Sequence, residues 1–395
     1  MRRTATLVLL LAALACSRSP TKAPSPADAI TTDGLLARSN LEAMIGGREA
    51  MLARNPDSGS VRLTLITLLQ ARASTYGRVE DLERAEGLGD EAVRRAPRSP
   101  EAWLARAASR AAVHRFREAG ADLDRAQSLR ADLDAIAAQR ASIALATGQL
   151  GEALTVLHAR AERVPGMASL SALGVGLAES GDAPGAARAF GHALERYRDT
   201  SPFPVAFVDF QRGLLAERAG DLAAAAERYR AVLRRLPGHA QAAVHLAGIE
   251  LQLGRVDAAS EALRTLLPEA SDPEIPATRA ALAYRRGNLA EAAREESTAR
   301  DRYHLLLERH PDAFADHAAR FFLEREPAEA LRWAVHNLEV RQTSEAYDLA
   351  LTAALRAGDP RARCDLARRA GAVGKGSVRL GILVSDALAV CGRAT

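Results

Sequence analysis

The sequence has few of the residues from which most protein cores are built. Aromatic residues make up only 4% of its 395 residues, whereas alanine supplies about one residue in five. Such a chain cannot fill a deep globular core, so it must pack small side chains between closely approaching helices, as repeat proteins do. Three cysteines are too few for a disulfide-rich miniprotein, and a hydrophobic content of 48% excludes a disordered or collagen-like chain.

Lysine is almost absent, because Lys22 and Lys375 are the only two among 53 basic residues. This preference for arginine is typical of a GC-rich genome, and the formal net charge is only +4. The basic excess is concentrated in residues 360–395. Nucleic-acid binding needs a clustered basic face with stacking aromatic residues, and this pattern does not provide one. We therefore expect no nucleic-acid partner.

The first residues, MRRTATLVLLLAALAC, have a short basic start, an apolar run and small residues before Cys16. This pattern is typical of a secretory signal and is too short for a membrane span. Its end, ALAC, resembles the lipobox of bacterial lipoproteins. The resemblance implies that residues 1–15 are removed and that Cys16 becomes the lipidated first residue. The alternative is an ordinary cleaved signal with an incidental cysteine.

Acyl chains on Cys16 would hold the chain at a membrane, since each buried methylene contributes about 0.8 kcal/mol. The next residue is Ser17 and not the Asp that typically retains such lipoproteins in the inner membrane. The resemblance therefore implies the periplasmic face of the bacterial outer membrane, with secretion to the periplasm as the alternative. After the cysteine, residues 16–31 form a Ser- and Pro-rich tether.

A glycine-led motif recurs in the remaining residues, 32–395, at intervals of about 34 residues. Each copy has Gly, a polar residue, three variable residues and Ala, and the copies begin at Gly148, Gly181, Gly220, Gly254 and Gly287. The glycine ends one helix at positive φ, and the alanine of the next helix lets the two helices approach closely. In four of these five copies a bulky packing residue follows the alanine by four positions, namely Leu157, Phe190, Tyr229 and Leu263.

With these residues the sequence resembles the tetratricopeptide repeat family, and residues 206–239 are the best copy. The resemblance covers most of residues 57–392. It implies an all-α fold, an α-solenoid of about eight to nine helix pairs in a right-handed superhelix, with a C-terminal capping helix. The second helix after Gly287 is about seven residues, or two turns, longer than the family pattern, so we expect it to project beyond its neighbours.

The resemblance also implies a concave groove, lined by the first helix of each pair, that takes a peptide or a partner helix. Matching the groove positions by repeat phase gives the candidates Phe207, Phe210, Leu214, Arg218, Gln241, Val244, Leu251, Gln252, Tyr284 and Arg285. Aromatic and apolar anchors with a few arginines are typical of binding hot spots. Phe207 and Phe210 are equally consistent with core contacts to the preceding helix.

Two cysteines remain near the C-terminus, Cys364 and Cys391. By repeat phase they lie at adjoining ends of antiparallel helices, so a disulfide is feasible in an oxidising compartment, and two free buried thiols are equally consistent. The nine histidines lack ligand spacing, and no nucleophile or acid–base motif occurs. We therefore expect no metal, no cofactor and no enzymatic activity.

The predicted function is a lipid-anchored periplasmic scaffold or adaptor for protein–protein interaction, serving a cell-envelope assembly or secretion machinery. Its expected partners are the membrane, through the lipid anchor, and an envelope protein or peptide in the groove. The alternative is a periplasmic carrier or sensor that binds a small ligand or a glycan in the same groove.

Overall fold

The computed structural model describes residues 31–371 and 378–391, and within these ranges every regular element is an α-helix. The first ten helices are α2 (Gly34–Arg54), α3 (Gly59–Tyr76), α4 (Glu80–Arg95), α5 (Pro100–Ala112), α6 (Phe116–Ser128), α7 (Leu133–Thr147), α8 (Leu150–Arg163), α9 (Met167–Glu179), α10 (Ala183–Arg196) and α11 (Phe203–Arg218). The others are α12 (Leu222–Arg235), α13 (Ala240–Gln252), α14 (Val256–Arg264), α15 (Glu274–Arg285), α16 (Leu289–Arg309), α17 (Pro311–Phe322), α18 (Pro327–Val340), α19 (Ser344–Arg356), α20 (Pro360–Ala370) and α21 (Val378–Cys391). The expected signal, Cys16 and the expected tether up to residue 30 lie outside the described residues.

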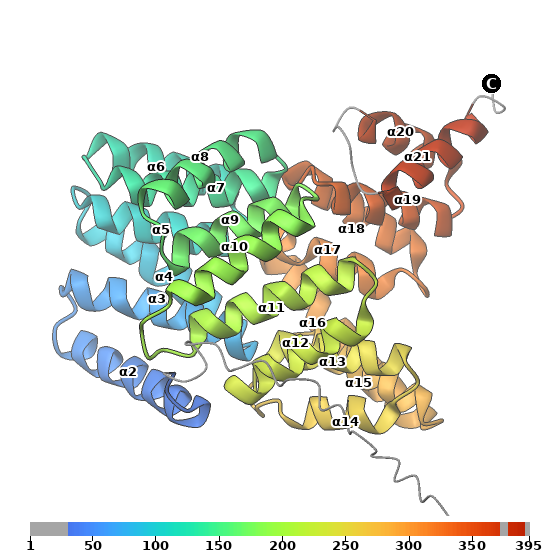
Figure 1. The fold of residues 1–395 in the computed structure, drawn as a ribbon, viewed down its shortest axis with the longest axis horizontal. Helices are drawn as coiled ribbons and strands as arrows, with labels where there is room; N and C mark the ends of the chain where they lie inside the picture. The colour runs from blue at the N-terminus through green and yellow to red at the C-terminus, as the bar shows by residue number, and fades with distance from the viewer. Residues whose placement is uncertain (1–30, 372–377, 392–395) are drawn as a thin grey trace, which may run out of the picture.

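Consecutive helices pack as pairs, from α3 with α4 through to α19 with α20, and each pair packs on the next (Figure 1). One helix at each end, α2 and α21, stands outside these pairs. The described residues thus confirm the predicted all-α solenoid of helix pairs. Below, the "first helix" and "second helix" of a pair follow chain order.

The turn inside most pairs is made by a glycine in the left-handed region. All five glycines of the repeated motif have a positive φ, as Gly148 (+88°) and Gly220 (+76°) illustrate. Glycine is favoured there because it has no Cβ to clash with the backbone. In the α5–α6 turn His114 takes this place with a φ of +58°, and its ring stacks on Phe116.

The small residues of the motif let the two helices of a pair approach closely. The motif alanines are all buried, namely Ala153, Ala186, Ala225, Ala259 and Ala292. Two first helices also use glycine against an aromatic ring of the second helix. A Cβ on Gly213 would lie 2.6 Å from Tyr229, and one on Gly174 would lie 2.5 Å from Phe190. The core is thus formed by helix contact at short range, as the alanine content predicts.

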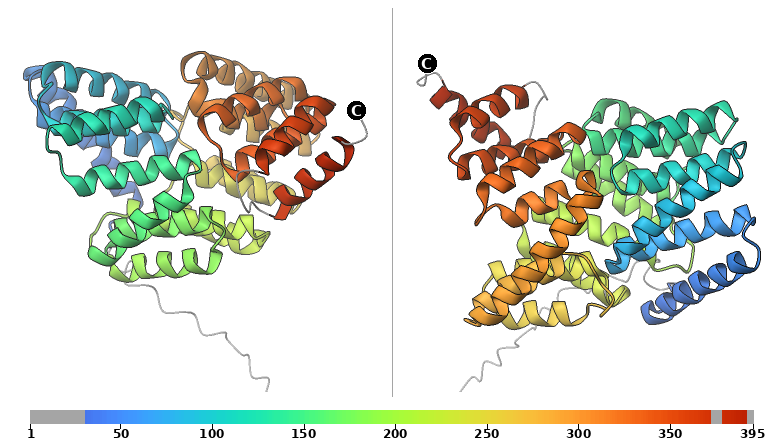
Figure 2. Two further views of the ribbon diagram at one scale, coloured as in Figure 1. Left: turned by 90° about the horizontal axis from the view of Figure 1, so that it is seen from above. Right: turned by 180° about the vertical axis from the view of Figure 1, so that it is seen from behind.

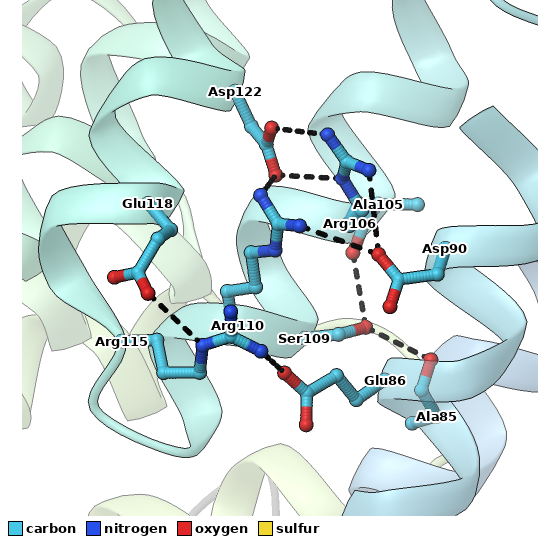
Figure 3. Close-up of polar contacts among 10 residues, drawn as sticks. All are labelled: Ala85, Glu86, Asp90, Ala105, Arg106, Ser109, Arg110, Arg115, Glu118 and Asp122. Carbon is cyan, nitrogen blue, oxygen red and sulfur yellow. Dashed lines mark hydrogen bonds and ion pairs between the residues drawn. The ribbon is translucent and has the colours of Figure 1, made fainter. Parts of the chain in front are cut away.

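Ion pairs between arginines and carboxylates connect neighbouring helices (Figure 3). Asp122 on α6 accepts hydrogen bonds from Arg106 Nε (2.9 Å) and Nη2 (2.7 Å), and also from Arg110 Nη1 (2.9 Å). Both arginines also contact Asp90 on α4 at 3.3 Å. The fork of a guanidinium can bind two carboxylates in fixed geometry, which a lysine ammonium cannot do. The arginine preference therefore has a structural use in this fold, beyond the genome composition that the sequence suggested.

The solenoid curves until its two halves touch. Figure 2 shows α2–α8 and α15–α21 on either side of α9–α14. The turns inside the pairs α3–α4 and α7–α8 meet the loops that precede α15 and α19, and the turn inside α5–α6 meets the first turn of α17. We call this set of contacts the clasp. It joins residues about 190 or more positions apart, so one superhelical turn closes on itself.

Several hydrogen bonds of the clasp involve backbone amide or carbonyl groups. The amides of Ser271 (2.8 Å) and Asp272 (3.1 Å) donate to the carbonyl of Gly77, and the Val79 amide donates to Ser271 Oγ (3.0 Å). His114 Nδ1 donates to the carbonyl of Asp312 at 3.0 Å. Such contacts demand a defined spacing between the halves, because a hydrogen bond tolerates only a few tenths of an ångström.

The α7–α8 turn makes the tightest approach of the clasp. A Cβ placed on Gly148 would lie 2.5 Å from the carbonyl oxygen of Gln342, in the loop between α18 and α19. Arg341 Nε, in the same loop, donates to the carbonyl of Ala146 at 3.4 Å. Glycine is therefore required at position 148 both for its φ and for the space beside it.

The long second helix, α16, does not project from the solenoid, so that expectation was wrong. Tyr303, Leu306 and Leu307 in its additional turns are buried. At its end, Arg309 and His310 each lie 3.3 Å from Glu83 on α4. The extra turns are covered because they reach across the superhelix to the clasp.

Candidate partner-binding groove

A groove lies between two first helices, α15 and α17. Neighbouring first helices such as α13 and α15, or α17 and α19, pack against each other, whereas the backbones of α15 and α17 approach less closely, as do those of α11 and α13. The side chains of Glu274 on α15 and His317 on α17 still form a hydrogen bond. The second helix between them, α16, has 21 residues, while α8, α10, α12 and α18 have 14 each.

This groove has a volume of about 300 Å³. Its floor is Ala292 and Glu296 on α16. The α15 wall carries three alanines with Tyr284 and Arg285. The opposite wall carries Phe321 at the end of α17, and Glu324 and Arg325 in the turn that follows it. The small residues on α15 leave room for a side chain of a partner, and the volume is at the lower end of the range for ligand sites.

Two aromatic rings stand on opposite walls. The Tyr284 side chain is 61% exposed, which is unusual for a large apolar ring. Phe321 is half-buried and fixed from behind by Tyr303 and Phe322, whose ring centroids lie 5.0 and 5.1 Å away. Exposed aromatic groups on a rigid support are frequent anchors in protein interfaces because they lose little entropy on binding.

The charges at the groove are paired, except at its α15 rim. Glu296 binds Arg325 at 2.5 Å and Arg300 at 3.5 Å, and Glu324 lies 3.2 Å from Arg356. Arg285 is exposed and has no ion pair within the described ranges. A guanidinium in this state can bind a carboxylate with two hydrogen bonds.

The groove lies away from the clasp. The clasp uses the N-terminal ends of α15, α17 and α19, where Ser271, Asp312 and Gln342 lie. Tyr284 and Phe321 are at the C-terminal ends of their helices. At 1.5 Å per residue, a twelve-residue helix separates these ends by about 18 Å.

Two of the ten predicted groove residues are core residues, so the prediction is corrected for them. Phe210 is only 7% exposed and packs against the rings of Tyr229 and His245 at 5.5 Å. Leu251 is buried in the same cluster. Neither side chain can reach a partner unless the core opens.

Arg218 is held across the interior of the superhelix. It binds Glu179 on α9 and Glu345 on α19, both at 2.8 Å. Burial opposes this charge, but the two carboxylates raise the pKa of Arg218 above its usual value. Its guanidinium therefore joins helices of this chain.

The other predicted residues are spread over three helices. Leu214 and Val244 are half-buried, while Phe207, Gln241 and Gln252 are exposed on α11 and α13. Tyr284 and Arg285 alone of the ten line the groove. Repeat phase missed Phe321 and Glu296, which also line the groove.

On the inner face near the clasp, charged side chains form ion pairs and hydrogen bonds with one another. His317 Nδ1 donates to Glu274 at 2.7 Å, and Arg341 binds Asp316 at 3.2 Å. The carboxylates of Asp316 and Glu274 raise the pKa of His317 to about 10, so this imidazole is protonated at neutral pH. These groups stabilise the closed turn and do not offer a free cation.

A second hollow of about 240 Å³ lies beside α7 and α8, between Leu133 and Val156, and has no aromatic lining. In the described part of the chain, no three His, Cys, Asp or Glu side chains gather as metal ligands would. None of the described helices has the length and apolarity needed to cross a membrane.

The structure joins Cys364 and Cys391 in a disulfide, with their Cα atoms 5.7 Å apart. The bridge connects α20 to α21 and closes a sequence separation of 27 residues. It secures the C-terminal end of the solenoid.

The fold and the groove define an α-solenoid of helix pairs with a surface suited to a partner segment. Residues 216–282 match the family model described as Tetratricopeptide repeat, which spans the chain from the end of α11 into α15. Together with the repeated helix pairs, this match supports a tetratricopeptide repeat protein. No curated protein sequence matches the chain.

Several solved structures are similar in fold. A chain of the APC/C hetero-tetramer Cut9–Hcn1 is 14% identical, with a TM-score of 0.46, over 83% of this chain and 63% of that one. A human IFIT1 dimer with PPP-AAAA is 14% identical, with a TM-score of 0.49, over 80% of this chain and 72% of that one. Yeast Tom70 is 13% identical, with a TM-score of 0.37, over 93% of this chain and 96% of that one. The chain thus spans less than two thirds of the Cut9–Hcn1 chain, and at these TM-scores none of the three is a guide to its ligands.

Proposed function

We propose that this protein is an interaction scaffold that binds a segment of a protein partner in the groove between α15 and α17. The observation that carries the proposal is the open groove itself, with exposed Tyr284 and Arg285 on one wall and Phe321 on the other. Scaffolds of this class are generally not enzymes, and the lack of catalytic activity stays a prediction.

The lining indicates the chemistry of the bound segment. Tyr284, Phe321 and Ala292 line the groove, so we expect it to accept one apolar side chain of the segment. A carboxylate near it on the segment would bind the free guanidinium of Arg285. The preferred partner is therefore an acidic segment with an aromatic or aliphatic anchor.

We further propose that the scaffold is lipid-anchored through Cys16 at the periplasmic face of the outer membrane, where it serves envelope assembly or secretion. This proposal rests on the lipobox-like end of the signal and on Ser17 after the cysteine. Replacing Cys16 with Ser should release the chain from membranes in cell fractionation. An unchanged membrane fraction would count against lipidation at this residue.

The carrier alternative requires a deep closed pocket. The two hollows described above are lined by exposed side chains, including Leu133 in one and Tyr284 in the other. No observation therefore favours a small-ligand or glycan carrier over the scaffold.

A displayed random peptide library, selected on the purified chain, tests the groove directly. Enriched peptides should combine an acidic residue with an apolar anchor, and Arg285→Glu or Tyr284→Ala should weaken their binding at least tenfold. Arg188→Glu on α10 is the matched control, because Arg188 is exposed and makes the same charge change far from the groove. Peptides that bind the Arg285 and Tyr284 variants as well as the native chain would disprove the groove assignment.

A further inference from the structure

The two walls of the groove, α15 and α17, are joined directly by one ion pair. His317 Nδ1 on α17 lies 2.7 Å from a carboxylate oxygen of Glu274 on α15, and no other hydrogen bond or ion pair links these two helices in the described part of the chain. The apolar side chains of the walls pack in different clusters: Leu282 of α15 packs with residues of α11–α14, whereas Ala318 and Phe322 of α17 pack with residues of α16 and α18–α21. The spacing of the walls thus depends on this pair and on α16, which packs against both.

The ion pair stands in line with the groove. Ala277 and Ala281, which line the α15 wall, follow Glu274 by three and seven residues, so the three side chains share one face of the helix. Phe321 follows His317 by four residues on α17 in the same way. The groove therefore begins about one helical turn beyond the pair.

The clasp fixes the N-terminal end of each wall. The amides of Ser271 and Asp272, just before α15, donate to the carbonyl of Gly77, and the carbonyl of Asp312 at the start of α17 accepts a hydrogen bond from His114. The groove lies toward the opposite ends of both helices. The ion pair stands between the fixed ends and the groove, so a change of spacing at the pair would pass to the groove walls.

Carboxylates on both walls would repel each other if His317 lost its charge. Glu274 and Asp272 lie on the α15 side, and Asp316 on the α17 side has Oδ1 3.7 Å from His317 Nε2. Burial and the neighbouring Glu274 raise the pKa of Asp272 to about 6, so negative charge is already costly at this point. The other charged or titratable groups that face the cluster are Arg302 and Tyr303 on α16, Arg320 on α17, Arg341 after α18, His245 on α13 and His114 in the α5–α6 turn.

The charge of His317 is present at neutral pH and is lost in alkali. The carboxylates of Asp316 and Glu274 raise the pKa of this imidazole to about 10. A group with a raised pKa stabilises the packed state fully below its ordinary pKa of about 6.5, and this contribution disappears as the pH rises through 10. The surrounding arginines keep their charge over the same range.

We infer that the His317–Glu274 ion pair sets the width of the groove, so that His317 is a positioning residue for the bound segment. The inference rests on the proposed function, which is the binding of an acidic segment between α15 and α17. With the charge in place, the walls keep the spacing that one apolar side chain can fill. Without it, repulsion between the carboxylates widens the groove, and the anchor loses contact with one wall.

Three variants of the full-length chain test this role. His317→Gln removes the charge and keeps a hydrogen-bond donor, while His317→Arg keeps a charge that does not titrate and can bind both Glu274 and Asp316. His336→Gln is the matched control, because His336 Nε2 also binds a carboxylate of α17, that of Asp312 at 2.8 Å, but does not reach α15. The ligand is a peptide selected on the native chain that contains no Lys, His, Tyr or Cys, and calorimetry gives its affinity at pH 7 and pH 10.

We expect His317→Gln to bind this peptide about five- to tenfold more weakly than the native chain at pH 7, with no further loss at pH 10. The native chain should fall toward the affinity of the Gln variant at pH 10. His317→Arg should bind with near-native affinity at both values, and His336→Gln should follow the native chain. Native affinity of His317→Gln at pH 7, or equal losses of the native chain and His317→Arg at pH 10, would overturn the inference.

Hydrogen exchange without any peptide separates this inference from the proposed function. His317→Gln should speed the exchange of amides in both α15 and α17, whereas His336→Gln should leave α15 unchanged. Unchanged exchange of α15 in His317→Gln would overturn the link between the walls, whether or not a peptide binds. A native chain that enriches no peptide, but shows the expected exchange, would contradict the proposed binding and leave the link between the walls supported.

Discussion

Replacing Gly148 with Ala, alongside Gly220→Ala as a control, isolates the contribution of the clasp. Both glycines end a first helix at similar positive φ values, +88° and +76°. An alanine in this backbone region costs about 1–2 kcal/mol at either site. The sites differ in their surroundings, because a Cβ at position 148 would lie 2.5 Å from Gln342 O and one at position 220 meets nothing within 4 Å.

The additional cost at Gly148 follows from that contact. Overpacking against a fixed group costs typically 1–3 kcal/mol, and here the neighbour is backbone, which cannot rotate away. We therefore expect Gly148→Ala to lose about 2–5 kcal/mol in free energy of unfolding, against about 1–2 kcal/mol for Gly220→Ala. If the halves separate to relieve the clash, the radius of gyration should rise for Gly148→Ala only.

Urea unfolding followed by circular dichroism gives the stability difference, and small-angle X-ray scattering gives the radius. Equal losses for the two variants, with unchanged scattering, would refute the reasoning. That result would mean that the α7–α8 turn does not touch the loop before α19 in solution.

Three further predictions concern the core, pH and the disulfide. Gly213→Ala should lower the free energy of unfolding by about 1–3 kcal/mol, because the new Cβ would collide with Tyr229. Gly191→Ala should raise it by about 0.4–1 kcal/mol, because a Cβ there meets nothing within 4 Å; thermal unfolding measures both changes. Burial lowers the pKa of His239 to about 4, so as the pH falls the unfolded chain takes up this proton before the folded chain does. The free energy of unfolding should therefore fall by up to about 3 kcal/mol between pH 6.5 and pH 4. His239→Asn should reduce this dependence of stability on pH. Cys391→Ser should destabilise the C-terminal end by about 3.5 kcal/mol, seen as faster hydrogen exchange in α21, and unchanged exchange would contradict a role for the bridge.

Local rules explain why the helix pairs were predictable. Most turns require a glycine at positive φ, and the helix after each requires an alanine where it meets the facing helix. These two positions are only a few residues apart and recur in most pairs, so the sequence shows them as a periodic motif. Gly220 and Ala225 are an example, and their conformation and burial are as the motif predicts.

The groove residues were only partly predictable for a related reason. First helices such as α11 and α13 are covered by helices on several sides, so they carry apolar residues all round. Repeat phase therefore could not separate Phe210 and Leu251, which face the core, from Tyr284, which faces solvent. Only the packed structure distinguishes these faces.

The sequence by itself determined the helix pairs, their turns and the excess length of α16. The tertiary structure alone decided what that excess does, because curvature accumulates over many pairs and depends on every interface. A small rotation per pair brings Gly148 to Gln342 and Glu83 to Arg309, far apart in the chain. The same geometry brings the end of the long helix α16 to the clasp.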